Sequence, residues 1–101
     1  MPKRDVDDSP RFRIFETREF LKRLSKLPAA DAQFLRKKLD GYVYPLLRAE
    51  PFFGSDIRKL RGYSPETWRY RIGRFRVFYE IDEDERIVFI LSVDLRRDAY
   101  R

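Results

Sequence analysis

The sequence predicts an α+β fold in one small domain, and three observations support this prediction. Between residues 20 and 46, apolar residues recur at the three- and four-residue spacing of amphipathic helices. From residue 57 onward, apolar and polar residues alternate as they do in half-buried strands. The chain has 101 residues, the size of one domain with one modest core. In outline the predicted order is β-α-α-β-β-β, with an N-terminal helical hairpin packed on one face of an antiparallel-rich sheet.

The first part of the chain is predicted to contain a strand and a helix. Residues 1–10 are polar and charged, and we interpret them as a flexible lead before a single domain over 11–101. Apolar and polar residues alternate at 11–15, which predicts a strand. Thr17 is the expected N-cap of a helix that ends before Pro28, because a threonine hydroxyl accepts a hydrogen bond from the first turn.

A second helix begins near residue 31 and has a weak point. Gly41 and Pro45 predict a kink or an early end near Tyr44, since proline lacks the N–H that a helix interior needs. The apolar stripe expected to face the sheet is Ala32, Leu35, Leu39, Tyr42, Val43 and Leu46. The later predicted strands are 57–63, 67–72, 75–82 and 86–93. The last of these is apolar on both faces and is therefore expected to be central and buried.

The composition narrows the classes of function. The absence of cysteine excludes disulfides, thiolate zinc sites and cysteine nucleophiles, and the absence of histidine removes the commonest general base and metal ligand. We therefore expect neither a metal nor a cofactor. The net charge of +6 suggests a polyanionic partner: nucleic acid, an anionic membrane surface or an acidic protein. No apolar run approaches the roughly 20 residues of a membrane span, and we expect a cytoplasmic protein.

Arginine occupies most of the polar strand positions between residues 67 and 82. Because side chains alternate across a strand, Arg69, Arg71 and Arg76 are expected on the face that the helices leave open. Cross-strand neighbours lie about 5 Å apart, and like charges repel at that distance, so a bound anion explains the cluster best. Guanidinium groups bind phosphate through a planar fork of donors, and Phe78 on the same face offers a ring for base stacking. The opposite face is predicted core: Trp68, Tyr70, Ile72, Phe75, Val77, Tyr79 and Ile81.

The residues also allow a second interpretation of these charges. Acidic residues are abundant, and the arginines would then form a solvated salt-bridge surface with Glu66, Glu80, Asp82, Asp94 and Asp98. The acidic run EIDEDE falls where a hairpin turn is expected, so we interpret it as a solvated turn rather than a metal site.

Two stretches of the chain resemble the RelE/ParE superfamily of bacterial toxin components: KLRGYSPETWRYRIGRFRVFYEID and IVFILSVDLRRDAYR. The resemblance covers nearly the whole domain, and the fold of this family agrees with the predicted element order. It implies the toxin of a toxin–antitoxin pair. RelE-type members cut messenger RNA in the ribosomal A site without a metal. The ribose 2′-hydroxyl attacks its own phosphate and leaves a 2′,3′-cyclic phosphate and a free 5′-hydroxyl.

The resemblance also implies roles for individual residues. The implied catalytic set is Arg69, Arg71, Arg76, Arg96 and Tyr100. The expected RNA-binding set is Lys59, Arg61, Arg74, Phe78 and Arg97. The first three catalytic residues would bind the scissile phosphate and stabilise its developing charge. Arg96 would be a phosphate ligand or the general acid, and Tyr100 would stack on a base or move a proton.

One departure from the family pattern concerns the general base. RelE-type toxins often have lysines where this chain has Arg69 and Arg71. Arginine stays protonated, whereas a lysine whose pKa is lowered can accept a proton. The base is therefore open between Tyr100, Glu66 and Glu80. Alternatively, electrostatic stabilisation of the pentavalent phosphate does most of the work.

Two other functions are compatible with the same fold. ParE-type relatives poison DNA gyrase, and an inactive relative would bind only RNA or its antitoxin. In every version the expected partner is a cognate antitoxin, encoded by an adjacent gene, whose acidic or amphipathic segment wraps the helices and the sheet edge. Messenger RNA on the ribosome is the second expected partner, and no membrane partner is expected.

Overall fold

The structure is a computed structural model that describes residues 11–95. Its elements are β2 (Arg13–Glu16), α1 (Arg18–Ser25), α2 (Ala29–Lys38), the π-helical turn η1 (Leu39–Val43), α3 (Tyr44–Ala49), β3 (Ile57–Lys59), β4 (Trp68–Ile72), β5 (Phe75–Asp82) and β6 (Ile87–Leu95). The expected lead, 1–10, and three expected site residues, Arg96, Arg97 and Tyr100, lie outside the described residues. No helix within 11–95 is long and apolar enough to cross a membrane.

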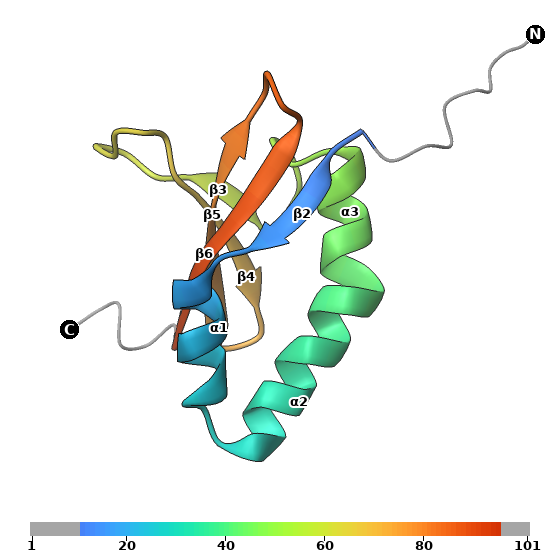
Figure 1. The fold of residues 1–101 in the computed structure, drawn as a ribbon, viewed down its shortest axis with the longest axis vertical. Coiled ribbons are helices and arrows are strands. Elements are labelled where there is room, and N and C mark those ends of the chain that lie inside the picture. Colours follow the sequence, from blue (N-terminus) through green and yellow to red (C-terminus); the bar gives the residue numbers. More distant parts are fainter. Residues whose placement is uncertain (1–10, 96–101) are drawn as a thin grey trace, which may run out of the picture.

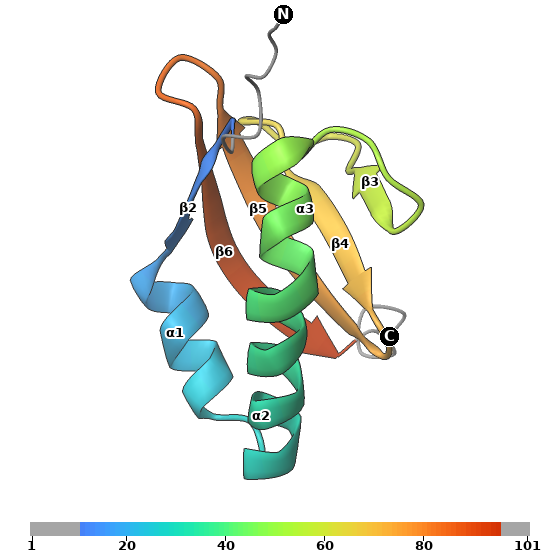
Figure 2. The same cartoon turned by 90° about the vertical axis from the view of Figure 1, so that its right-hand side faces the viewer.

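The strands form a five-stranded sheet in the order β2-β6-β5-β4-β3. The pair β2–β6 is parallel, and the other three pairs are antiparallel. Figure 2 shows α2 and α3 lying across one face of this sheet, with α1 beside β6. The predicted α+β class is therefore confirmed. The outline order counted three strands after the helices, although four segments were predicted there; the structure has all four, and the first, β3, is a three-residue edge strand.

Thr17 links the start of α1 to the sheet. Its hydroxyl oxygen accepts a hydrogen bond from the Phe20 N–H at 3.2 Å, which confirms the predicted N-cap. The same hydroxyl donates to the Ile90 carbonyl in β6 at 2.7 Å. A single side chain thus caps the helix and joins it to the neighbouring strand, and Phe20 and Leu24 of α1 are buried against the core.

Helix α2, the turn η1 and helix α3 form one continuous long helix. Its hydrogen bonding changes from α-helical to π-helical where the sequence predicts an interruption. The π-helical turn η1 ends directly before Tyr44, whose N–H donates to the Leu39 carbonyl five residues earlier. A wider turn takes an extra residue and so rotates the residues that follow. Two members of the predicted apolar stripe are wrong: Tyr42, inside this turn, and Leu46, after it, are exposed. Tyr44 and Leu47 take their places in the core.

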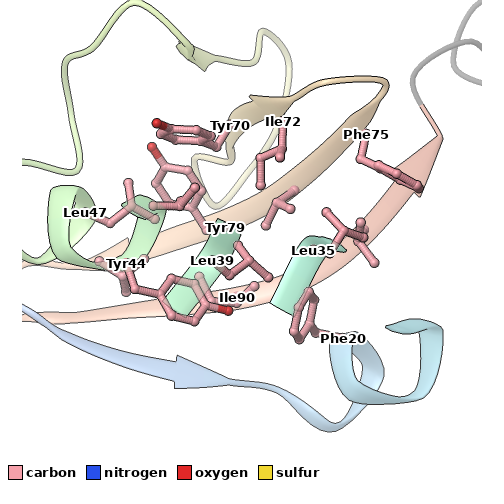
Figure 3. Packing of buried hydrophobic residues seen from close by; sticks show 14 of the residues in the cluster. Phe20, Leu35, Leu39, Tyr44, Leu47, Tyr70, Ile72, Phe75, Tyr79 and Ile90 are labelled. Carbon is pink, nitrogen blue, oxygen red and sulfur yellow. The ribbon is translucent and has the colours of Figure 1, made fainter. Parts of the chain in front are cut away.

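The core lies between the long helix and the sheet (Figure 3). The strand residues buried there include Trp68, Tyr70, Ile72, Phe75, Val77, Tyr79, Val88, Ile90 and Val93. This confirms the predicted apolar face of β4 and β5, except that Ile81, near the end of β5, is only half-buried. The Tyr79 hydroxyl donates to the Pro51 carbonyl at 2.7 Å, which satisfies the polar atom of the largest fully buried side chain among the described residues.

An irregularity in β6 decides which of its residues face the helices. Phe78 pairs with Ser92 but Tyr79 pairs with Ile90, so Leu91 is an extra residue in the ladder. The bulge keeps Ser92 off the helix side and returns Val93 to the core. The prediction for this strand was half right: β6 lies inside the sheet, but only one of its faces is buried. Its other apolar residues, Ile87, Phe89, Leu91 and Leu95, are half-buried.

Candidate nucleic-acid interface

Three predicted site residues meet on the face of the sheet away from the helices. In the β4–β5 hairpin, Arg71 lies directly opposite Arg76, and Arg69 lies opposite Phe78. Directly opposed side chains share a face and have Cβ atoms about 5 Å apart. Because Tyr70 and the other alternate residues of β4 are buried under the helices, these arginines lie on the open face. The structure therefore brings Arg69, Arg71 and Arg76 together as the alternation predicts.

A fourth arginine belongs to the same surface. Arg58 of β3 is exposed and lies opposite Arg69. We call Arg58, Arg69, Arg71 and Arg76 the arginine face. The sequence prediction missed Arg58 because alternation alone does not say how β3 is aligned with β4; that alignment depends on the loop between them.

Two expected RNA-binding residues, Lys59 and Arg74, do not share this face. Lys59 lies opposite Trp68 on the helix side, where its Nζ is 3.0 Å from the Glu66 carboxylate. Arg74 turns toward α2, and its Nη2 lies 2.9 Å from Oδ1 of Asp31. Arg61 is exposed in the turn after β3. Of the described residues in the RNA-binding set, Phe78 is the one that the strand register places on the same face as the arginines.

The ion pairs of the described residues bear on the salt-bridge interpretation. One of them is on the arginine face: Arg71 Nη2 is 3.5 Å from Asp56 Oδ1, and the two side chains are 45% and 36% exposed. A long, solvated pair of this kind contributes little to stability. Asp94 pairs with Arg23, and Glu66 pairs with Lys59. Two of the acids proposed to neutralise the arginines are thus paired with cations outside the arginine face.

The tyrosines with displaced pKa values are unsuitable as general bases. Burial is the largest cause in each case and raises the pKa of Tyr70 to about 12, and the pKa values of Tyr44 and Tyr79 further. All three are buried on the helix side, and each keeps its proton at neutral pH. Among the base candidates, Glu80 lies on the open face opposite Phe89, and Tyr100 lies outside the described residues.

Residues 11–95 contain no group of three or more aspartates, glutamates, histidines or cysteines that could hold a metal ion. The arginine face supplies fixed positive charges and N–H donors on one side of the β4–β5 hairpin. Such an arrangement suits an anion with several acceptor oxygens, of which phosphate is the commonest in biology.

Known proteins share both the sequence and the fold of this chain. Residues 14–100 match the family described as ParE toxin of type II toxin-antitoxin system, parDE. RelE1 from Methanocaldococcus jannaschii is 32% identical over 91 residues, which cover 90% of this chain and 97% of that protein.

Two solved structures are similar over most of their length. The toxin–antitoxin complex RelBE2 from Mycobacterium tuberculosis contains a chain with a TM-score of 0.66 and 28% identity, covering 87% of this chain and all of that one. The archaeal RelE–RelB complex from Pyrococcus horikoshii contains one with a TM-score of 0.62 and 26% identity, covering 85% of this chain and 96% of that one.

Proposed function

This chain belongs to the RelE/ParE superfamily of toxins of toxin–antitoxin systems, and on that premise we propose that it is a metal-independent endoribonuclease. In this proposal it cuts messenger RNA on the ribosome and thereby inhibits translation. The observation that carries the proposal is the arginine face, where Arg71 and Arg76 oppose each other on neighbouring strands. This activity would take place where ribosomes work, in the cytoplasm.

In the proposed reaction the arginine face binds the scissile phosphate. The ribose 2′-oxygen attacks the phosphorus, the bond to the 5′-oxygen breaks, and the products are a 2′,3′-cyclic phosphate and a 5′-hydroxyl. Negative charge grows on the non-bridging oxygens in the transition state, and guanidinium groups from β4 and β5 would stabilise it without rearranging. Removing one such preorganised donor from an active site typically costs about 100- to 1000-fold in rate.

The remaining roles concern proton transfer and RNA contacts. We propose Arg96 as a phosphate ligand or the general acid, and Tyr100 as a stacking or proton-transfer residue. Glu80, whose position in β5 is on the open face, would serve as a base. Phe78 would stack on a base, and Arg97 would hold the flanking backbone. We propose that three further cations bind the flanking RNA rather than the scissile phosphate: Lys59, Arg61 and Arg74.

The proposal is tested by cleavage in a reconstituted translation system. We expect the full chain to cut ribosome-bound messenger RNA and to leave 5′-hydroxyl ends. Arg76→Ala should reduce the rate about 100-fold or more, because it removes a central phosphate donor. The matched control is Lys37→Ala, which removes one positive charge from the exposed end of α2. Both variants should retain the far-UV circular dichroism of the parent.

Two results would contradict the nuclease activity, and a third would contradict the role of the arginine face. Intact messenger RNA accompanied by DNA breaks would identify a gyrase poison, the function of ParE-type relatives. Expression without growth arrest would identify a binding module. Equal cleavage by Arg76→Ala and Lys37→Ala would remove the arginine face from the reaction.

We also propose an antitoxin partner for this chain, because the similar solved toxins were crystallised with theirs. Three apolar residues along the long helix, Phe34, Tyr42 and Leu46, are 42%, 56% and 43% exposed, and Lys38 lies in the same row. The row borders a groove of about 220 Å³ along β4. Strand β3 pairs with β4 only from Trp68 to Tyr70, so the rest of this edge of β4 has no pairing with β3. An amphipathic, acidic segment would suit this combination of apolar surface, lysine and strand edge.

The antitoxin proposal has its own test. We expect the product of an adjacent open reading frame to bind the chain in a pull-down and to suppress its toxicity. The double substitution Tyr42→Ala/Leu46→Ala should weaken binding about tenfold or more, since a few apolar anchors carry most interface energy. Phe53→Ala is the control, because Phe53 is 78% exposed in the loop before β3 and does not line this groove. Unchanged affinity in the double variant would place the antitoxin elsewhere.

A further inference from the structure

A large aromatic side chain is exposed on the open face, at the edge of the sheet formed by β2. Phe15 of β2 is 55% exposed. Figure 1 shows β2 running alongside β6, and in this parallel pair Phe15 is the register partner of Phe89. The two rings contact each other edge to face, with their centroids 5.7 Å apart. Because Val88 and Ile90 are fully buried in the core, Phe89 and its partner Phe15 lie on the face away from the helices.

A third ring connects this pair to the arginine face. Phe89 is the register partner of Glu80 in β5, and Phe78 precedes Glu80 by two residues on the same face. Diagonal neighbours of this kind lie about 7–8 Å apart, within reach of aromatic side chains. Phe78 in turn lies opposite Arg69 of the arginine face. We call Phe15, Phe89 and Phe78 the aromatic patch, which extends across the open face from β2 to the arginine face.

The fold does not account for the exposed ring of Phe15. Of the exposed large apolar residues that the structure describes, Phe15 is the one that lies in a strand. The attachment of β2 to the helices comes from its other face, where Ile14 packs against the core and Glu16 accepts hydrogen bonds from the long helix. A single exposed apolar residue needs no explanation, but three adjoining rings beside a row of cations do.

The charges around the aromatic patch favour a single-stranded nucleic acid. Arg58 and Arg71 of the arginine face are exposed, and proteins that bind single strands combine such cations, which hold the backbone, with rings that stack on the bases. On the other side of Phe89, Glu80, Asp82 and the acidic turn after β5 line a groove of about 410 Å³ with it. Carboxylates repel phosphates but accept hydrogen bonds from the amino groups of bases. Bases rather than backbone are therefore expected at the aromatic patch.

We propose that Phe15 and Phe89 form a stacking site for the bases of RNA that flank the scissile phosphate. This inference rests on the proposed nuclease function for the identity of the ligand, and it extends the RNA contact surface from the arginine face across β6 to β2. The ligand at this site is single-stranded, because the faces of paired bases are already stacked within a duplex, whereas the unstacked bases of a single strand are open to aromatic side chains.

The test uses the full chain and a short single-stranded 2′-O-methyl RNA, which cannot be cut because its attacking hydroxyl is blocked. In fluorescence anisotropy, Phe15→Ala should weaken binding about 5- to 100-fold, the usual effect of removing an aromatic ring that stacks on a base. Phe15→Trp should retain the affinity, because an indole ring also stacks. The matched control is Leu21→Ala, since Leu21 is 46% exposed but lies on α1. On a matched RNA of abasic sugars, Phe15→Ala and the parent should bind equally.

The outcomes separate this inference from the nuclease proposal. Equal affinity of Phe15→Ala and the parent for the RNA with bases overturns the stacking site and leaves the nuclease in place. A loss that is as large on abasic RNA overturns it too, because Phe15 would then act through the fold. Weaker capture of the antitoxin by Phe15→Ala, with RNA affinity unchanged, would identify a protein-docking surface instead. Base-dependent binding without cleavage of ribosome-bound messenger RNA would support the stacking site and overturn the nuclease.

Discussion

The two faces of the β4–β5 hairpin are made from the same strands but differ in almost every property. On the helix side, Trp68, Tyr70 and Ile72 are at most 9% exposed. On the other side, Arg69 is half-buried and Arg71 is exposed. Burying a large apolar side chain stabilises a fold by about 1.5–3 kcal/mol, whereas a solvated charge contributes little. The comparison shows that the side of the sheet under the helices specifies the fold, which leaves the open face available for chemistry.

This difference can be tested at two adjacent residues of β4. Ile72→Ala should lower the free energy of unfolding by about 2–5 kcal/mol, because it leaves a cavity in the core. Arg71→Ala should change it by about 0.5 kcal/mol or less, since its pair with Asp56 is long and solvated. Urea unfolding followed by circular dichroism measures both. Similar losses in the two variants would contradict the division between the faces.

A smaller effect on the free energy of unfolding is expected for the Glu16 carboxylate, a polar group between the sheet and the long helix. Oε2 of Glu16 accepts hydrogen bonds from Arg36 Nη1 at 2.8 Å and from the Tyr44 hydroxyl at 2.5 Å, which joins β2 to the long helix. Glu16→Ala leaves both donors without this acceptor and should cost about 1–3 kcal/mol of unfolding free energy. Asp40→Ala is the matched control, because Asp40 also pairs with Arg36 but is 56% exposed. A larger loss in the control would show that the exposed pair matters more.

The pH dependence of stability should report the same buried side. Burial, then the charges of Asp56 and Tyr42, raises the pKa of Tyr70 from 10.0 to about 12. Between these values the unfolded chain releases the phenol proton while the folded chain keeps it. The free energy of unfolding is therefore unaffected by this group below pH 10 and decreases as the pH rises from 10 to 12. Tyr70→Phe should make this fall less steep, and Tyr63→Phe, in an exposed loop, should not. Equal slopes in all three chains would mean that Tyr70 is hydrated.

The smallest change in stability, and a clear change in binding, is expected on the open face. Arg71→Ala should reduce the slope of log affinity against log salt for single-stranded RNA by about 1, because one phosphate contact releases about one counterion. Fluorescence anisotropy at several salt concentrations measures this slope. Lys37→Ala should leave it unchanged, and an unchanged slope in Arg71→Ala would remove Arg71 from the RNA interface.

Local patterns in the sequence were sufficient for much of this fold. The Thr17 cap, the interruption near Tyr44 and the alternation of β4 and β5 all follow from steric rules that act over a few residues. Those rules also place Arg69, Arg71 and Arg76 on one face, because alternation along each strand needs no knowledge of the rest of the chain. The α+β class and the candidate site were predictable for this reason.

Only the tertiary structure decided the alignment of distant segments. The register of β3 places Arg58 rather than Lys59 on the arginine face, and the bulge in β6 sets which residue opposes Arg76. The pair between Arg23 and Asp94 joins residues 71 positions apart. Such contacts depend on how whole elements pack and on the loops that join them, and no local steric rule contains that information.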